Sequence, residues 1–206
     1  AFDDDCYFDI FVDYAKGGPE DILVQVIATN RGPDAAELHV LPTLWFRNDW
    51  AKWIARPSKR PEIKQITLPE GITVVETKHE ILGSYHLYCD GDVQLLFTEN
   101  ETNYERVFGT LNETPFVKDG INDYIVNGRQ SAVNPEKNGT KVAAHYEFKV
   151  SPGQSGIVRL RLTSKTYVAE DANTVNASLF GKDFEETFTA RRRDEDEFYR
   201  SVTPPS

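Results

Sequence analysis

The chain has 206 residues, with 23 lysine and arginine side chains against 33 aspartates and glutamates, which gives a formal net charge of −10 at pH 7. This balance argues against nucleic acid as a partner, because phosphate neutralisation needs a basic face, and equally against an anionic membrane surface. The length suits one large β domain that folds without stabilising disulfides or metal ions. The sequence has no run of 18 apolar residues to span a bilayer.

Two cysteines, Cys6 and Cys89, are too few for a disulfide framework. We interpret them as reduced thiols of a cytoplasmic protein, with a single bridge between them as the alternative. The chain has no methionine, begins Ala1-Phe2-Asp3 and ends Thr203-Pro-Pro-Ser206 like the start of a linker. We therefore expect a segment of a longer polypeptide.

Strand patterns dominate the first half of the chain. Apolar and acidic residues alternate over residues 7–14, whereas residues 22–29 are more uniformly apolar, as in a strand covered on both faces. Pro42, in the middle of residues 38–46, predicts an edge strand or a bulge, since proline donates no ladder hydrogen bond. Further short strands are predicted at residues 63–68, 73–78, 85–89 and 93–97. The first three strands of the chain, up to residues 38–46, follow one another in the order of an antiparallel meander.

A hairpin is predicted late in the chain, from residues 145–150 and 157–162 around a Ser-Pro-Gly turn. Its alternation places Val158 and Leu160 inward and leaves Arg159 and Arg161 in water. Residues 99–141, by contrast, have little periodicity and predict a long irregular loop, kept in order by its aromatic residues.

One strong helix is predicted, at residues 183–202. Phe180, Phe184 and Phe188 are four residues apart and form an apolar stripe, which resumes at Phe198 and Val202. The three arginines of residues 191–193 are expected to face acidic residues four positions later. We thus predict a mainly β protein, an antiparallel β-sandwich over residues 1–165, with residues 166–206 as a linker that carries this helix.

The sequence contains none of the compact motifs of nucleophilic, zinc-dependent or phosphate-binding sites. Four widely separated histidines are better interpreted as packed or surface residues than as metal ligands. Asp119, Asn122 and Asp123 offer oxygens to Ca²⁺ but lack the EF-hand pattern, so calcium is a minor alternative. We expect no metal and no cofactor.

Two features suit a sugar. Glu99 and Glu101 are spaced like the carboxylate pairs that glycosidases use, although acids this frequent make such a pair easy to find, and we favour loop hydrogen bonding as their role. The cluster Trp45, Arg47, Asn48, Trp50 and Trp53 offers flat rings for pyranose faces and planar polar groups for hydroxyls. We favour anchoring of a loop or docking on a neighbouring domain as the role of this cluster, with sugar binding as the alternative.

Several blocks of the chain, in this order, resemble one family, the bacterial glycoside hydrolases related to family 63. These blocks are Asp4-Asp-Cys-Tyr-Phe-Asp-Ile-Phe-Val-Asp-Tyr-Ala15, Thr29-Asn-Arg-Gly-Pro33, Leu41-Pro-Thr-Leu-Trp-Phe-Arg-Asn48, Leu96-Phe-Thr-Glu-Asn-Glu-Thr-Asn103 and Lys118-Asp-Gly-Ile-Asn-Asp-Tyr124. The resemblance implies an N-terminal β super-sandwich, a helical linker and an (α/α)₆ barrel that carries the acid and base of an inverting α-glycosidase. The chain corresponds to the later β domain and the start of the linker, so no catalytic residue transfers to it.

The resemblance implies a non-catalytic sandwich whose partner is the barrel of the same polypeptide, with an oligosaccharide as the ligand and neither nucleic acid nor membrane as a partner. The alternatives are a freestanding carbohydrate-binding module and a small hydrolase that uses Glu99 and Glu101. The predicted substrate-binding residues are Trp45, Arg47, Trp50, Glu99, Asn100, Glu101, Asp119, Asn122, Asp123 and Tyr124.

Overall fold

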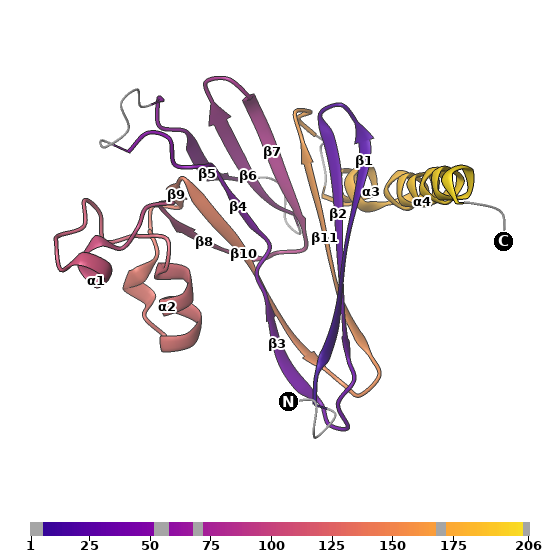
Figure 1. Cartoon of the computed structure of the whole chain (residues 1–206), viewed down its shortest axis with the longest axis horizontal. Helices are drawn as coiled ribbons and strands as arrows, with labels where there is room; N and C mark the ends of the chain where they lie inside the picture. Colours follow the sequence, from indigo (N-terminus) through magenta and orange to yellow (C-terminus); the bar gives the residue numbers. More distant parts are fainter. Residues whose placement is uncertain (1–5, 52–57, 68–71, 168–171, 204–206) are drawn as a thin grey trace.

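The computed structural model describes residues 6–51, 58–67, 72–167 and 172–203. It is mainly β, with two antiparallel sheets, two small helices at one end and a long C-terminal helix at the other (Figure 1). The predicted fold class is therefore confirmed. Among the helices of these residues, none combines the length and the apolar character that a membrane span requires.

The larger sheet has seven strands within the described residues, in the order β1-β2-β11-β7-β6-β5-β9. Their bounds are β1 Phe8–Gly18, β2 Asp21–Asn30, β5 Glu62–Ile66, β6 Ile72–His79, β7 Gly83–Asp90, β9 Asn138–Gly139 and β11 Ser155–Thr163. The predicted positions of these strands are largely correct, but the predicted meander of the first three strands is wrong. β1 and β2 pair as expected, whereas residues 38–46 belong to the other sheet and β2 takes β11 from the end of the chain as its second neighbour.

The smaller sheet is built on β10 (Lys141–Val150). One edge of β10 pairs with β3 (Ala36–Val40) and then with β4 (Thr43–Trp45), and the other pairs with β8 (Gln94–Thr98). Pro42 lies in the break between β3 and β4, and its carbonyl accepts a hydrogen bond from the Ala144 amide. The edge position inferred from Pro42 is confirmed.

The predicted hairpin of residues 145–150 and 157–162 is wrong. β10 belongs to the smaller sheet and β11 to the larger one, so the turn between them crosses from one sheet to the other. A hairpin and a pair of strands in facing sheets give the same alternating pattern, because strands that face each other across a core also bury every second side chain.

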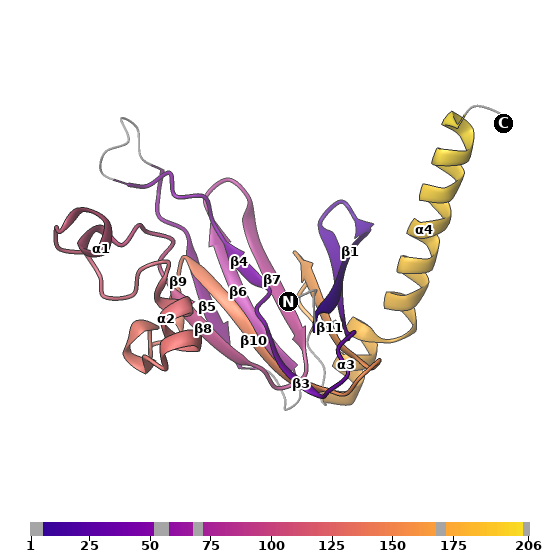
Figure 2. The ribbon, with the colours of Figure 1, turned by 60° about the horizontal axis from the view of Figure 1, so that its bottom comes forward.

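Among the described residues, three apolar clusters pack the layers of the structure together. The sheets share a core that includes Val75, Leu87, Phe97 and Val142. The opposite face of the larger sheet is covered by α3 (Ala172–Phe180) and the first half of α4 (Lys182–Val202), as Figure 2 shows. The outer face of the smaller sheet is covered in part by α2 (Gly120–Asn127).

The helical content differs from the prediction in two places. Residues 99–141 are not an irregular loop: they contain α1 (Tyr104–Phe108), α2, a 3₁₀ turn (Gln130–Ala132) and β9. The prediction also missed α3. The long C-terminal helix is confirmed as α4, and Phe180, Phe184 and Phe188 are buried as expected.

The end of α4 does not follow the predicted stripe, because Phe198 and Val202 are 60% and 57% exposed. The predicted ion pairs also differ. Arg191 pairs with Asp194, three positions on, and Arg192 reaches Asp13 of β1. The two cysteines are not bridged, since Cys6 is exposed and Cys89 is buried in the core between the sheets.

The expectation that Arg161 faces water is wrong. Its side chain is 4% exposed and forms two hydrogen bonds with the Asp21 carboxylate, at 2.6 and 2.9 Å. It also donates to the carbonyls of Ser178 and Leu179 near the end of α3. Arg161 faces outward from the sheet, as alternation requires, but α3 covers that face.

Candidate functional site

A cleft of about 470 Å³ lies where residues 48–51 and 58–60 meet the segment after β8. The residues that line it include Asn48, Trp50, Arg60, Glu101, Tyr104 and Leu111. Part of the predicted site is therefore brought together here. Trp53, which was assigned to the same cluster, lies outside the described residues.

Arg60 joins the two carboxylates that the sequence singled out. Its Nη2 atom lies 2.9 Å from Glu99 Oε2 and 3.0 Å from Glu101 Oε1. Thr140 Oγ1 donates to Glu99 at 2.6 Å, and Trp50 Nε1 donates to Glu101 at 3.2 Å. Both carboxylates are therefore engaged as acceptors around one cation, which favours a structural and binding role over a paired acid and base.

Asn100 holds the strands that end at the cleft. Its amide N–H donates to Thr140 Oγ1 and its Nδ2 atom donates to the Phe46 carbonyl, both at 2.8 Å, while Asn48 Nδ2 donates to the Asn100 carbonyl at 3.1 Å. The side chain of Asn100 is thus directed at the backbone after β4. Asn100 positions the wall of the cleft through these bonds.

Asn103 forms hydrogen bonds that connect the chain after Glu101 to α1 and to Asp119. Its Oδ1 atom accepts from the Arg106 amide and from Asn112 Nδ2, and its Nδ2 atom donates to both oxygens of Asp119 at 3.2 Å. Arg106 Nη1 also reaches Asp119, at 3.1 Å. These bonds fix α1, a helix too short to be stable by itself.

Asp119 and Asp123 line a second hollow of about 540 Å³, beside the cleft. Each carboxylate has its own arginine there, because Asp123 pairs with Arg129 at 3.1 Å. Carboxylates already neutralised in this way are poor calcium ligands, so the arrangement disfavours the calcium alternative. Asn122 is exposed on α2.

The remaining predicted residues lie elsewhere. Trp45 is 54% exposed and lines a separate apolar hollow with Leu44 and Tyr85. Arg47 is exposed, and Tyr124 accepts a hydrogen bond from Gln94 Nε2 at 2.8 Å on the outer side of the smaller sheet. The ten predicted residues are therefore divided over at least three places.

Arg60 and the apolar residues near the cleft were missed by the sequence analysis. The side chains of Glu99 and Glu101 are 17% and 16% exposed and require a cation, but the sequence does not indicate that Arg60 supplies it. Val107, Phe108 and Leu111 are 58%, 64% and 89% exposed, and we call these three the apolar rim. The sequence analysis places them in the long irregular loop of residues 99–141.

Two of the four histidines, neither of which lines this cleft, are in contact with each other on the smaller sheet. His39 Nδ1 and His145 Nε2 are 2.7 Å apart, and the two rings stack with centroids 5.0 Å apart. His145 is buried, as expected for a packed histidine, and this burial lowers its pKa, partly opposed by the nearby Glu147 carboxylate. Residue spacing along the chain could not indicate this pair, because it forms between strands.

Comparison with known proteins finds no family model that matches the chain. The chain is similar to a Saccharomyces cerevisiae protein named Uncharacterized protein YMR196W, with 30% identity over 229 aligned residues. The alignment covers 98% of this chain and 21% of the yeast protein. The chain thus spans about a fifth of the length of the curated relative that it matches.

Proposed function

We propose that the chain is a non-catalytic β-sandwich part of a family-63-like glycoside hydrolase, an α-glycosidase acting on oligosaccharides. In this role it packs against an (α/α)₆ barrel absent from the chain and helps to shape the active site. The observation that carries the proposal is the apolar rim on α1 and the following turn, next to the cleft. The sequence resemblance and a relative about five times longer support it.

The rim has the properties of an interface. α1 buries none of its own residues, yet side-chain caps and the Arg106–Asp119 pair hold it in place. Ordering a short helix only to expose Val107, Phe108 and Leu111 is unfavourable for a surface that stays in water. A second domain seated on the rim would bury these side chains and close the cleft on that side.

The cleft itself suits sugar hydroxyls. Trp50 contributes an aromatic face, while Arg60 and Glu101 contribute a donor and an acceptor at the same wall. Because Arg60 already engages both glutamates, the cleft binds and orients a ligand, and the acid and base come from the partner domain. We place this protein in the cytoplasm.

The test uses the polypeptide encoded by the whole reading frame that contains this chain, assayed on α-linked oligosaccharides. Trp50→Ala is expected to raise KM with little change in kcat, because Trp50 contributes binding and no proton transfer. Trp45→Ala is the matched control, since it removes an equally large ring from a separate hollow. Equal effects of the two substitutions would contradict the assignment of the cleft.

A second candidate function is a freestanding carbohydrate-binding module, favoured by the fact that the cleft is formed within the chain itself. It predicts that the 206-residue chain binds oligosaccharides and that Trp50→Ala removes the accompanying change in tryptophan fluorescence. Binding by the chain alone, together with no hydrolysis by the longer polypeptide, would favour this function over the first.

A further inference from the structure

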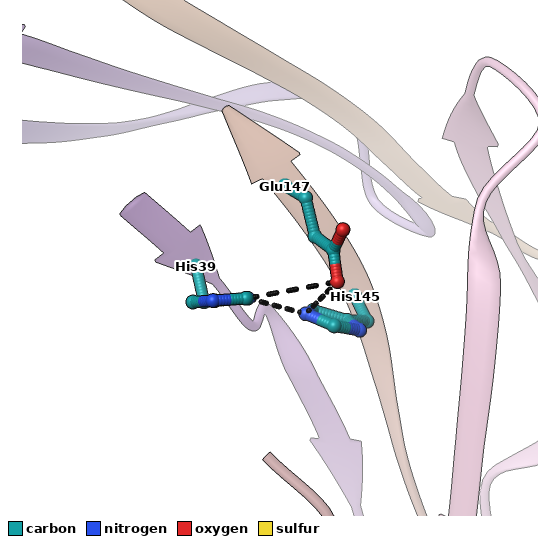
Figure 3. A group of neighbouring side chains, drawn as sticks. All are labelled: His39, His145 and Glu147. Carbon is teal, nitrogen blue, oxygen red and sulfur yellow. Dashed lines mark hydrogen bonds and ion pairs between the residues drawn. The ribbon is translucent and has the colours of Figure 1, made fainter. Parts of the chain in front are cut away.

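A group of side chains of the types that ligate metals lies on the outer face of the smaller sheet, and it shares no residue with the cleft. His39 of β3 and Glu147 of β10 are direct cross-strand partners. His145 is two positions before Glu147 on β10, so all three side chains project from the same face of the sheet. Figure 3 shows them converging from the two strands.

The donor atoms form a compact triangle. His39 Nδ1 and His145 Nε2 are 2.7 Å apart, His145 Nε2 and Glu147 Oε1 are 3.3 Å apart, and His39 Nδ1 and Glu147 Oε1 are 3.8 Å apart. Tetrahedral zinc with bonds of about 2.0–2.1 Å separates its ligand atoms by about 3.3 Å. The three edges bracket this value, so small side-chain rotations bring all three atoms to bonding distance.

A second layer of contacts orients the buried ligand. His145 Nδ1 lies 3.3 Å from Gln94 Oε1, and Gln94 Nε2 in turn donates to the Tyr124 hydroxyl. A proton on Nδ1 that is held by Gln94 leaves the Nε2 lone pair directed at the triangle. Histidine ligands in metal sites are commonly fixed in this way by a hydrogen bond at the other ring nitrogen.

Exposure differs across the group in the way an open metal site requires. The His145 side chain is 4% exposed, whereas the side chains of His39 and Glu147 are 43% and 67% exposed. The buried ring supplies a rigid anchor, and the two exposed ligands can adjust to the ion. Solvent has access to the outer side, where water completes the coordination.

We propose that His39, His145 and Glu147 bind Zn²⁺ through two imidazole nitrogens and one carboxylate oxygen. Two nitrogens and an oxygen suit zinc better than calcium or magnesium, which prefer oxygen ligands throughout. The ion joins β3 to β10. Since β3 pairs with β10 alone among the described strands, zinc fastens an edge strand to the centre of its sheet.

The test is a calorimetric titration of the 206-residue chain with Zn²⁺, at fixed pH and salt, on four proteins. His39→Gln and Glu147→Gln are each expected to weaken binding by more than about tenfold, because loss even of an outer-layer partner costs about 10- to 100-fold. Glu37→Gln is the matched control: it removes the same charge from the same face of β3, two residues from His39, and should leave the affinity unchanged.

Gln94→Ala tests the orienting contact separately and is expected to weaken zinc binding by about 10- to 100-fold. Both ligand substitutions are at exposed side chains, so circular dichroism should show folded variants. Cobalt serves as a second probe, with a visible absorption band in the parent chain that is lost in His39→Gln. The proposal is overturned if the parent chain does not bind zinc, or if Glu37→Gln weakens binding as much as Glu147→Gln.

Discussion

The contact between Arg161 and Asp21 is the main buried ion pair described in this chain. The two side chains are 4% and 8% exposed and meet through two hydrogen bonds. Arg161 also lies near the ring of Tyr167 and donates to carbonyls of α3, so nearly all of its donors are used. A charge placed in this way is stabilising only as long as its partner is present.

Asp21→Ala is therefore expected to lower the free energy of unfolding by about 3–5 kcal/mol, because it leaves a buried guanidinium without its counter-charge. Urea denaturation measures the change. Asp183→Ala is the control, since Asp183 lies 3.5 Å from Arg161 with a side chain that is 71% exposed, and should cost less than about 1 kcal/mol. An equal decrease in the free energy of unfolding in the two variants would show that burial of the ion pair does not determine its contribution to stability.

Glu76 gives a prediction about pH. Lys64 and Lys78 lie 3.0 and 3.3 Å from its carboxylate, and the hydrogen bond from Lys64 holds the pKa of Glu76 below its ordinary value of 4.5. A depressed pKa contributes stability above pH 4.5 that is lost as the pH falls through the folded-state value. The pKa of Lys64 is raised above 10.5 by the same contact, so its contribution is lost at the alkaline end.

Glu76→Gln should thus lower the melting temperature at pH 7, and the difference from the parent chain should shrink as the pH falls below 4.5. High salt should shrink it as well, since the groups are partly exposed. Glu136→Gln, in an exposed turn, serves as the control. A difference that is constant from pH 7 to pH 3 would contradict the assignment to this ion pair.

At the scale of elements, the two halves of α4 differ. Phe184 and Phe188 are buried against the larger sheet together with Val175 and Leu179 of α3. Phe198 is 60% exposed near the other end, where the helix extends away from the sheet (Figure 2). The same residue type therefore has two roles along one helix.

Phe184→Ala is expected to cost about 3–5 kcal/mol of unfolding free energy, because it leaves a cavity between α4 and the sheet. Phe198→Ala removes the same ring from an exposed position and should cost less than about 0.5 kcal/mol. Chemical denaturation followed by circular dichroism compares the two. A large loss from Phe198→Ala would mean that the end of α4 is packed in solution.

Local patterns predicted the strands well but not their partners. The alternation in residues 145–150 and 157–162 is compatible with a hairpin and with a crossing between sheets, and only the rest of the fold decides between them. α3 was missed because its buried side chains are few, chiefly Val175, Leu179 and Phe180. Arg161 was misplaced for a related reason, since alternation gives the face of a strand but not what covers it.

Local sequence patterns also identify single residues of the cleft but not all of their contacts. Glu99, Glu101 and Trp50 could be proposed from their own chemistry, and the fold brings them together. Arg60 could not, because its role depends on a contact across about 40 residues. The His39–His145 contact spans 106 residues and depends on the pairing of β3 with β10, which no spacing rule reports.

At the scale of the whole molecule, the short helices α1 and α2 lie at one end of the sandwich, and the long C-terminal helix α4 leaves from the other (Figure 1). The cleft belongs to the first end, because Tyr104 of α1 lines it. The apolar rim belongs to the first end and borders the cleft through Leu111. A partner domain that covers the rim would also be placed to share the cleft.

The isolated chain should accordingly bind a hydrophobic dye or self-associate through the rim. Phe108→Ser combined with Leu111→Ser should reduce both effects without lowering the melting temperature, because both side chains are already exposed. Ile81→Ser, which removes an 84% exposed side chain from another turn, is the control. Dye binding that is the same in all three proteins would contradict the assignment of the rim as an interface.

The most direct test of the account is a side-by-side hydrolysis assay of the 206-residue chain and of the polypeptide encoded by its whole reading frame, on α-linked oligosaccharides. Turnover is expected from the longer polypeptide alone, with a raised KM when it carries Trp50→Ala. Turnover by the isolated chain that disappears in Glu101→Gln would contradict it, since the catalytic groups would then lie in the sandwich.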